Sequence, residues 1–121
     1  MANHPIVHVE ISSKDHARMK DFYGKLFGWS FQDYPDMNYV TFNTGQEQTG
    51  GGFNPVSDQL PAGTVVFYVH TDNIDDTLAR ATALGAKIIL PKMEVPGVGH
   101  MAWFADPSSN QIAVLQPAGQ M

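Results

Sequence analysis

One pattern occurs twice in this chain, and it constrains the fold more than any other feature. When residues 7–31 are shifted forward by 57 positions, Asp15 falls on Asp72 and Gly28 falls on Gly85 without a gap. Each copy contains a β-rich run, a polar helix start, a stretch with apolar residues at helical spacing, and a glycine that leads into another β-rich run. Two copies of strand, helix and strand in 121 residues predict a repeated α+β unit.

Two further β-rich runs follow each copy, so the predicted unit is βαβββ. Repeat 1 covers about residues 5–54, repeat 2 covers about residues 64–116, and a linker with prolines and a glycine covers residues 55–63. Each repeat is too short to bury a stable core of its own. We therefore expect a single domain over residues 1–121 that consists of two βαβββ halves.

Both helices are predicted from their ends and from their apolar stripes. The first follows an N-cap at Ser13 or Asp15 and stops at Gly28, and the second follows an N-cap at Asp72 and stops at Gly85. The stripe expected to be buried in each helix consists of Met19, Phe22, Tyr23, Leu26 and Phe27, and of Ile74, Leu78, Ala81 and Leu84.

Composition excludes several classes of partner. A net charge of −5 without any Lys/Arg cluster argues against nucleic acid. No apolar run approaches the ~18 residues of a membrane span, and the first residues lack the charged and apolar regions of a signal peptide. The absence of cysteine excludes thiol chemistry and Cys-bound zinc. We expect a cytoplasmic protein with no nucleic-acid or membrane partner.

Several segments carry a resemblance to a known superfamily. They are His8 followed by Asp15, Phe22-Tyr23, Leu26-Phe27-Gly28-Trp29, Asp72, Gly85-Ala86, Pro96-Gly97-Val98-Gly99 and Asp106-Pro107. Over about residues 5–116 the chain resembles the vicinal oxygen chelate (VOC) superfamily of glyoxalase I, extradiol dioxygenases, and fosfomycin- and bleomycin-resistance proteins, and most of all its glyoxalase-related branch. The resemblance implies two βαβββ repeats that form open half-barrels around a cavity, and a homodimer.

The resemblance also says where a metal would be held. Metal-dependent members take one ligand from the first strand and one from the last strand of each unit. The matching positions here are His8, Val65, one near Ala113 and one within residues 50–53, and His8 alone of these can bind a metal ion. We therefore expect no tightly bound metal or other cofactor, with His8 as a ligand if a divalent metal is bound.

Candidate site residues follow from strand alternation. His8 and Glu10 are two apart on a strand, so they share a face and could act as a catalytic acid–base pair; alternatively, they are a hydrogen-bonded remnant of a metal site. On the second unit, Val65 and Phe67 share a face that the resemblance assigns to the cavity. His100 and Trp103 are further predicted ligand contacts, although His100 could instead face solvent.

Three functions remain open at this point. The first is a glyoxalase-like protein that binds a small, partly apolar organic ligand without the metal of the family. The second is a metal-dependent lyase, isomerase or oxygenase of the glyoxalase type that uses His8 and non-standard ligands. The third is a metal-free acid–base enzyme that uses His8 and Glu10.

Overall fold

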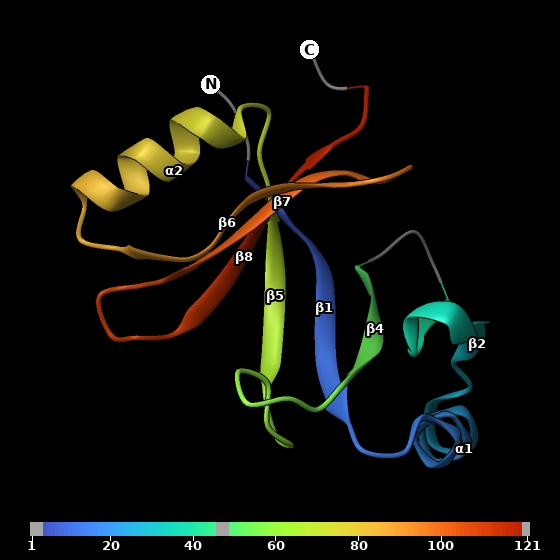
Figure 1. Cartoon of the computed structure of the whole chain (residues 1–121). Coiled ribbons are helices and arrows are strands. Elements are labelled where there is room, and N and C mark those ends of the chain that lie inside the picture. The colour runs from blue at the N-terminus through green and yellow to red at the C-terminus, as the bar shows by residue number, and fades with distance from the viewer. Residues whose placement is uncertain (1–3, 46–48, 120–121) are drawn as a thin grey trace. The chain divides into compact units, whose positions relative to one another are not determined.

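The computed structural model describes residues 4–45 and 49–119, so part of the glycine-rich connection before β4 lies outside the described residues. Its elements, in chain order, are β1 (Ile6–Ser13), α1 (His16–Phe27), β2 (Ser30–Tyr34), the short 3-10 helix η1 (Pro35–Met37), β3 (Tyr39–Asn43), β4 (Gly50–Pro55), β5 (Val65–His70), α2 (Ile74–Ala83), β6 (Lys87–Val95), β7 (Gly99–Ala105) and β8 (Gln111–Pro117). The prediction of an α+β chain with two βαβββ repeats is confirmed (Figure 1).

The chain divides into two compact units. The N-terminal unit is His8–Val66, and the C-terminal unit contains the residues from Phe67 onward together with those up to Val7. Both boundaries fall inside strands, β1 and β5, rather than in the predicted linker.

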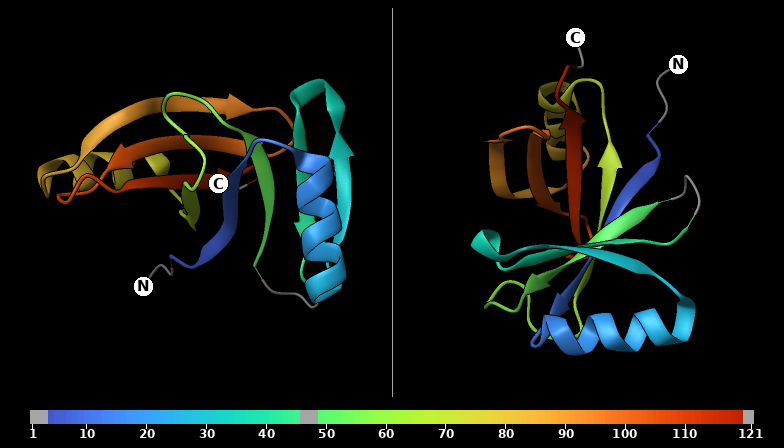
Figure 2. Two further views of the ribbon diagram at one scale, coloured as in Figure 1. Left: turned by 90° about the horizontal axis from the view of Figure 1, so that it is seen from below. Right: turned by 90° about the vertical axis from the view of Figure 1, so that its right-hand side faces the viewer.

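In the N-terminal unit the strands follow the order β2-β3-β4-β1. β1 runs parallel to β4, whereas β3 is antiparallel to both β4 and β2. Helix α1 lies along one face of these strands (Figure 2), where Val40, Phe42 and Phe53 form the buried core. Met19 and Tyr23, one helical turn apart, bring α1 into contact with that core.

The prediction that all five apolar residues of α1 are buried is wrong. The helix face toward the sheet carries Met19 and Tyr23, together with His16, whose ring lies 6.4 Å from Phe53. A sheet covers one stripe of a helix packed on it, and the apolar set of α1 is wider than that stripe. Three of its members are more than half exposed, and they are Phe22, Leu26 and Phe27.

In the C-terminal unit the order is β5-β8-β7-β6, with β5 parallel to β8 and the other pairs antiparallel. Helix α2 packs on one face of these strands (Figure 1), and Ile74 from its first turn joins Ala102 and Val114 in the buried core. Leu78 contributes to this packing, whereas Leu84, the last member of the predicted stripe, is 77% exposed.

The second helix begins one residue later than the sequence predicts. Asn73, not Asp72, is the N-cap, because its side chain accepts a hydrogen bond from the Asp76 backbone N–H at 3.0 Å. In α1 the N-cap is Asp15, so the starts of the two helices are related by a shift of 58 positions rather than 57. The extra residue matters for the strands before the helices, since a shift by one residue exchanges the two faces of a strand.

Candidate functional site

The face of the N-terminal sheet that α1 does not cover is polar. On β1 it carries His8 and Glu10, whose partners across the strand pair are Gly50 and Gly52 in β4. On β3 the same face carries Tyr39, because the next residue, Val40, points to the opposite face and into the α1 core. Alternation therefore places an imidazole, a carboxylate and a phenol on one side of three neighbouring strands.

Tyr39 connects the two predicted catalytic residues. Its hydroxyl lies 2.8 Å from His8 Nε2 and donates a hydrogen bond to Glu10 Oε2 at 2.9 Å. The direct separation between His8 Nε2 and Glu10 Oε2 is longer, 3.5 Å. The predicted His8/Glu10 pair is thus brought together, and the phenol of Tyr39 bridges it.

The phenol of Tyr39 engages one ring nitrogen of His8. Its hydroxyl donates to Glu10 Oε2 and lies 2.8 Å from His8 Nε2, and the donor in this second contact depends on the imidazole tautomer. In either tautomer Nε2 makes its hydrogen bond with the phenol.

Asn54, at the end of β4, extends the network. Its side-chain N–H donates to Glu10 Oε1 at 3.1 Å, so protein groups bind both oxygens of this carboxylate. Asn54 and its strand partner Ser12 are both more than nine-tenths buried. Asn54 Oδ1 and Ser12 Oγ have no hydrogen-bond partner among the described residues, which leaves two buried polar atoms beside the network.

Gly52 makes room for Tyr39. A Cβ atom built at Gly52 would collide with the hydroxyl and the ring of Tyr39. Any other residue at position 52 would therefore force the phenol away from His8 and Glu10. The run of glycines in β4, which lacks every side chain that could bind a metal ion, is the feature that admits the tyrosine.

The residues present do not fit the divalent metal that the superfamily implies. Among residues 4–45 and 49–119, no three His, Asp or Glu side chains come close enough to hold a metal ion together. The Nε2 atom of His8 makes a hydrogen bond with the Tyr39 hydroxyl, and Glu10 accepts from Tyr39 and Asn54. The β4 positions that share the face of His8 and Glu10 before Asn54 are glycines.

The corrected repeat alignment changes which residue of the second repeat corresponds to His8, and the new residue cannot bind a metal ion either. Counted from the helix N-caps, His8 corresponds to Val66 rather than Val65. Val66 is buried, and so is Ala113, the partner of Tyr68 in β8. Aliphatic side chains hold both positions.

The predicted orientation of Val65 and Phe67 is wrong for the same reason. They share a strand face with Val69, which packs against the core under α2. The 57-residue shift had assigned this face to the cavity. Val65 itself is 58% exposed.

The other two predicted ligand contacts lie on opposite faces of β7. His100 shares the face of Ala102 and Phe104, which contact the α2 core, so it is on the helix side of the sheet. Trp103 is on the other face and packs edge-on against Tyr68, with ring centres 6.5 Å apart. The indole N–H of Trp103 is buried and has no acceptor among the described residues. Ligand contact by these residues stays a prediction.

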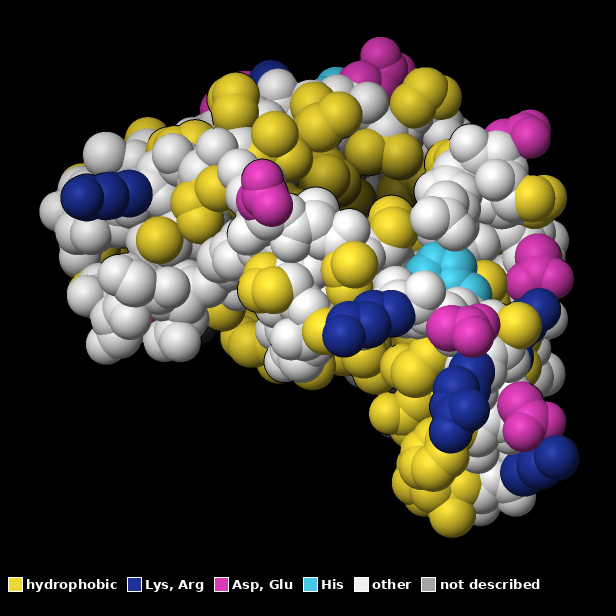
Figure 3. Space-filling model, turned by 60° about the horizontal axis from the view of Figure 1, so that its bottom comes forward, with side chains coloured by type: hydrophobic (Ala, Val, Ile, Leu, Met, Phe, Trp, Pro, Cys, Tyr) yellow, Lys and Arg dark blue, Asp and Glu magenta, His cyan; other side chains and the backbone are white. Residues whose placement is uncertain are grey.

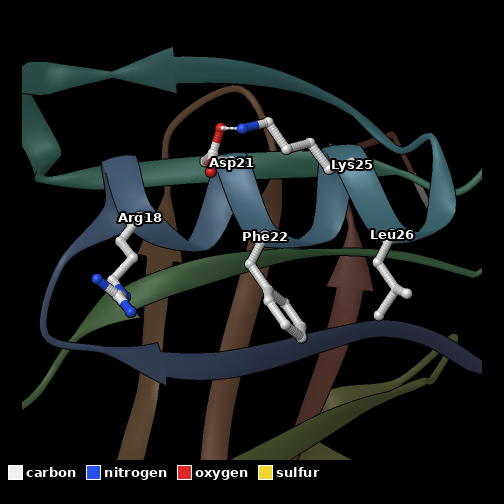
Figure 4. Close-up of a pocket in the computed structure, with 5 residues that line it drawn as sticks. All are labelled: Arg18, Asp21, Phe22, Lys25 and Leu26. Carbon is white, nitrogen blue, oxygen red and sulfur yellow. Dashed lines mark ion pairs between the residues drawn. The ribbon is translucent and has the colours of Figure 1, made fainter.

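Two open depressions lie elsewhere on the N-terminal unit. One, of about 530 Å³, surrounds the start of α1 between Ser13 and Asn38. The other, of about 500 Å³, lies on the outer side of α1 between Arg18, Phe22 and Leu26, beside the Asp21–Lys25 ion pair of 3.0 Å (Figure 4). Hydrophobic side chains are also exposed at several places on the face shown in Figure 3. Neither depression contains His8 or Glu10.

Sequence reasoning missed Tyr39 and Asn54 as members of the site. Nothing in the neighbours of Tyr39 along the chain marks it as a partner of His8. The available signal was the alternation of β3 combined with three consecutive glycines in β4, since a strand without side chains leaves space for a large neighbour.

No helix in the described part of the chain is both long and apolar enough to cross a bilayer.

Taken together, the βαβββ units and a polar site on the face away from the helix define a protein of the VOC fold. The family model for the Glyoxalase/Bleomycin resistance protein/Dioxygenase superfamily matches residues 5–114, and the chain belongs to this family. The solved structures that it resembles include the protein BH1468 from Bacillus halodurans C-125 (TM-score 0.73, 12% identity, 99% of both chains) and a superfamily member from Vibrio splendidus 12B01 (TM-score 0.68, 15% identity, 94% of this chain and 99% of that one).

Curated relatives by sequence include the anthracycline biosynthesis protein DnrV of Streptomyces peucetius, 31% identical over 122 residues that cover 87% of this chain and 44% of DnrV. A glyoxylase-like domain-containing protein of Didymella fabae is 26% identical and matches over 93% of both chains. The chain thus spans less than half the length of DnrV and nearly the full length of the Didymella protein.

Proposed function

We propose that this chain is a glyoxalase-like protein that binds a small, partly apolar organic ligand without the tightly bound metal of its superfamily. The observation that carries the proposal is the network of His8, Tyr39, Glu10 and Asn54. It ties up the carboxylate and one imidazole nitrogen through protein hydrogen bonds and leaves about a quarter of the His8 side chain exposed.

Such a network suits ligand binding. A hydrogen-bonded imidazole fixed by a phenol and a carboxylate is a preorganised polar anchor, and it loses little side-chain freedom when a ligand arrives. The buried Asn54 Oδ1 and Ser12 Oγ are available to hydrogen-bonding groups, since neither has a partner among the described residues. The relative DnrV is named for anthracycline biosynthesis, which supports a polycyclic, partly apolar ligand class.

Titration of the purified chain with an anthracycline and with bleomycin, in buffer that contains EDTA, tests the proposal. We expect saturable binding by calorimetry, and His8→Ala should weaken it about tenfold because the anchor is lost. The same titration of Trp103→Phe tests the predicted ligand contact at Trp103. Binding that needs an added divalent ion, or one ion per chain in the purified protein by mass spectrometry, would contradict the proposal.

A second candidate function is a metal-free acid–base enzyme. The hydrogen bonds from His8 through Tyr39 to Glu10 form a continuous path along which a proton could move. In that case His8→Ala should abolish incorporation of solvent deuterium next to the carbonyl of a substrate while its binding persists. Equal loss of binding and exchange would favour the binding function instead.

We also propose a homodimer. The apolar residues exposed on α1 and the outer strands of the sheet leave surface that a second copy could cover. The dimer and the small-molecule ligand are the partners we propose. We further propose that the protein works in the cytoplasm, in keeping with its lack of cysteine.

A further inference from the structure

We propose that Tyr39 and Gly52 together close the metal position of the superfamily in this chain. The phenol of Tyr39 occupies the space that a ligand side chain on β4 would need. This inference rests on the metal-free function proposed above, and it names the two residues that enforce it.

The first step is the placement of position 52. Gly52 is the strand partner of Glu10 on one side and of Thr41 on the other, so it lies in the middle of the three strands that carry the site. A side chain there would project from the same face as Glu10, because paired residues of neighbouring strands point to the same side. Position 52, like position 50, is therefore a place from which the last strand of this unit could offer a metal ligand.

The second step is steric. Even the first carbon of a side chain at position 52 would collide with the hydroxyl and the ring of Tyr39. The ring cannot move aside freely, because its hydroxyl is held by His8 at 2.8 Å and by Glu10 at 2.9 Å. A donor at position 52 and Tyr39 in its present place exclude one another.

The third step concerns the remaining donors. The Tyr39 hydroxyl makes hydrogen bonds with His8 Nε2 and with Glu10 Oε2, so the two side chains that could bind an ion are turned toward the phenol. The desolvated hydrogen bonds at Glu10, which is 12% exposed, would have to be broken before an ion could enter. One residue thus blocks the position sterically and occupies its donors as well.

The inference predicts that the position can be reopened. Tyr39→Ala should remove the phenol from His8 and Glu10. Tyr39→Ala/Gly52→Glu should add a third donor on the adjacent strand, and three protein ligands are typical of an open zinc site. Tyr39→Phe is the matched control, because it removes the hydroxyl but keeps the ring that fills the space beside Gly52.

The probes are NiCl2 and ZnCl2, titrated by calorimetry into the EDTA-stripped, dialysed chain of residues 1–121. We expect no saturable site in the natural protein or in Tyr39→Phe, a weak site in Tyr39→Ala, and one ion per chain in Tyr39→Ala/Gly52→Glu, bound about a hundredfold more tightly than in Tyr39→Ala. Addition of His8→Ala to the double variant should reverse this gain, which separates the designed site from ion binding by surface histidines.

A double variant that is folded by circular dichroism and binds ions no more tightly than the natural protein would overturn the inference. That result would leave the proposed function untouched, because ligand binding in EDTA is measured separately. One ion per chain in the natural protein would overturn both. If the double variant does not fold, Tyr39→Ala decides: its melting temperature should rise with NiCl2 by more than that of the natural protein, and an equal response would overturn the inference.

Discussion

Phe53 shows at the scale of one residue how the N-terminal unit is held together. Its side chain has no exposed surface, and its ring lies 5.3 Å from Phe42, 5.8 Å from Tyr23 and 5.9 Å from Phe31. Phe22, on the outer side of α1, is the opposite case, since 55% of it is exposed. The same residue type therefore has two different roles in one unit.

We expect Phe53→Ala to lower the free energy of unfolding by about 3–5 kcal/mol, because it leaves a cavity among four aromatic neighbours. The control Phe22→Ala should change it by no more than about 0.5 kcal/mol, as is usual for exposed positions. Urea unfolding followed by tryptophan fluorescence measures both. Equal losses in the two variants would contradict the assigned burial.

At the scale of an element, the start of α2 decides which strand faces correspond between the units. Asn73 accepts the hydrogen bond from Asp76 N–H. Asp72 lies outside the helix, and its Oδ1 is 3.8 Å from His70 Nε2. We expect Asn73→Ala to cost about 1 kcal/mol of stability through the lost cap, and Asp72→Ala less than about 0.5 kcal/mol. Chemical denaturation of the pair measures this difference. A larger loss of stability in Asp72→Ala than in Asn73→Ala would indicate that Asp72 is the N-cap, as the 57-residue alignment requires.

The turn between β7 and β8 depends on a carboxylate. Asp106 accepts hydrogen bonds from the Asn110 side chain and backbone N–H and from the Ser108 N–H. These contacts, the Asn110 side chain foremost, hold the pKa of Asp106 below its ordinary value of 3.8. A lowered pKa means that the ionised carboxylate stabilises the folded chain above pH 3.8.

We therefore expect Asp106→Asn to melt at a lower temperature than the natural protein at pH 7. The difference should shrink once the pH falls below 3.8, as the carboxylate of the natural protein becomes protonated through its lowered folded pKa. Asp58→Asn, in the exposed linker, controls for the loss of one charge. Thermal melts between about pH 2.5 and 7 measure the effect. A difference that grows toward low pH would show the opposite linkage.

At the scale of the whole molecule, the proposed homodimer predicts a measurable mass. Light scattering after size exclusion should give twice the chain mass of 13.3 kDa at micromolar concentration. Several apolar side chains, Leu26 and Leu84 among them, are more than half exposed on the single chain. A mass of 13.3 kDa at every concentration would contradict the dimer.

Much of this architecture could be predicted from the sequence because the signals are local. The glycine at position 28 has the left-handed backbone that ends α1, Asp15 caps that helix, and most of the β-rich runs form strands close to the expected positions. β6 is an exception, since it continues to Val95 through residues expected to form a loop. His8 and Glu10 share a face because residues two apart on any strand do so. The residue types alone also indicate that, of the positions the resemblance assigns to a metal, His8 is the one with a donor side chain.

Tertiary structure alone decided what surrounds these residues. Tyr39 reaches His8 across 31 positions of the chain and Asn54 reaches Glu10 across 44, and no local pattern encodes such pairs. The faces of Val65 and Phe67 depended on one residue of alignment, which only the packing of Val69 against α2 settles. Strand pairing and side-chain packing are set by the whole fold, so the partners in the site become visible only when the strands lie next to one another.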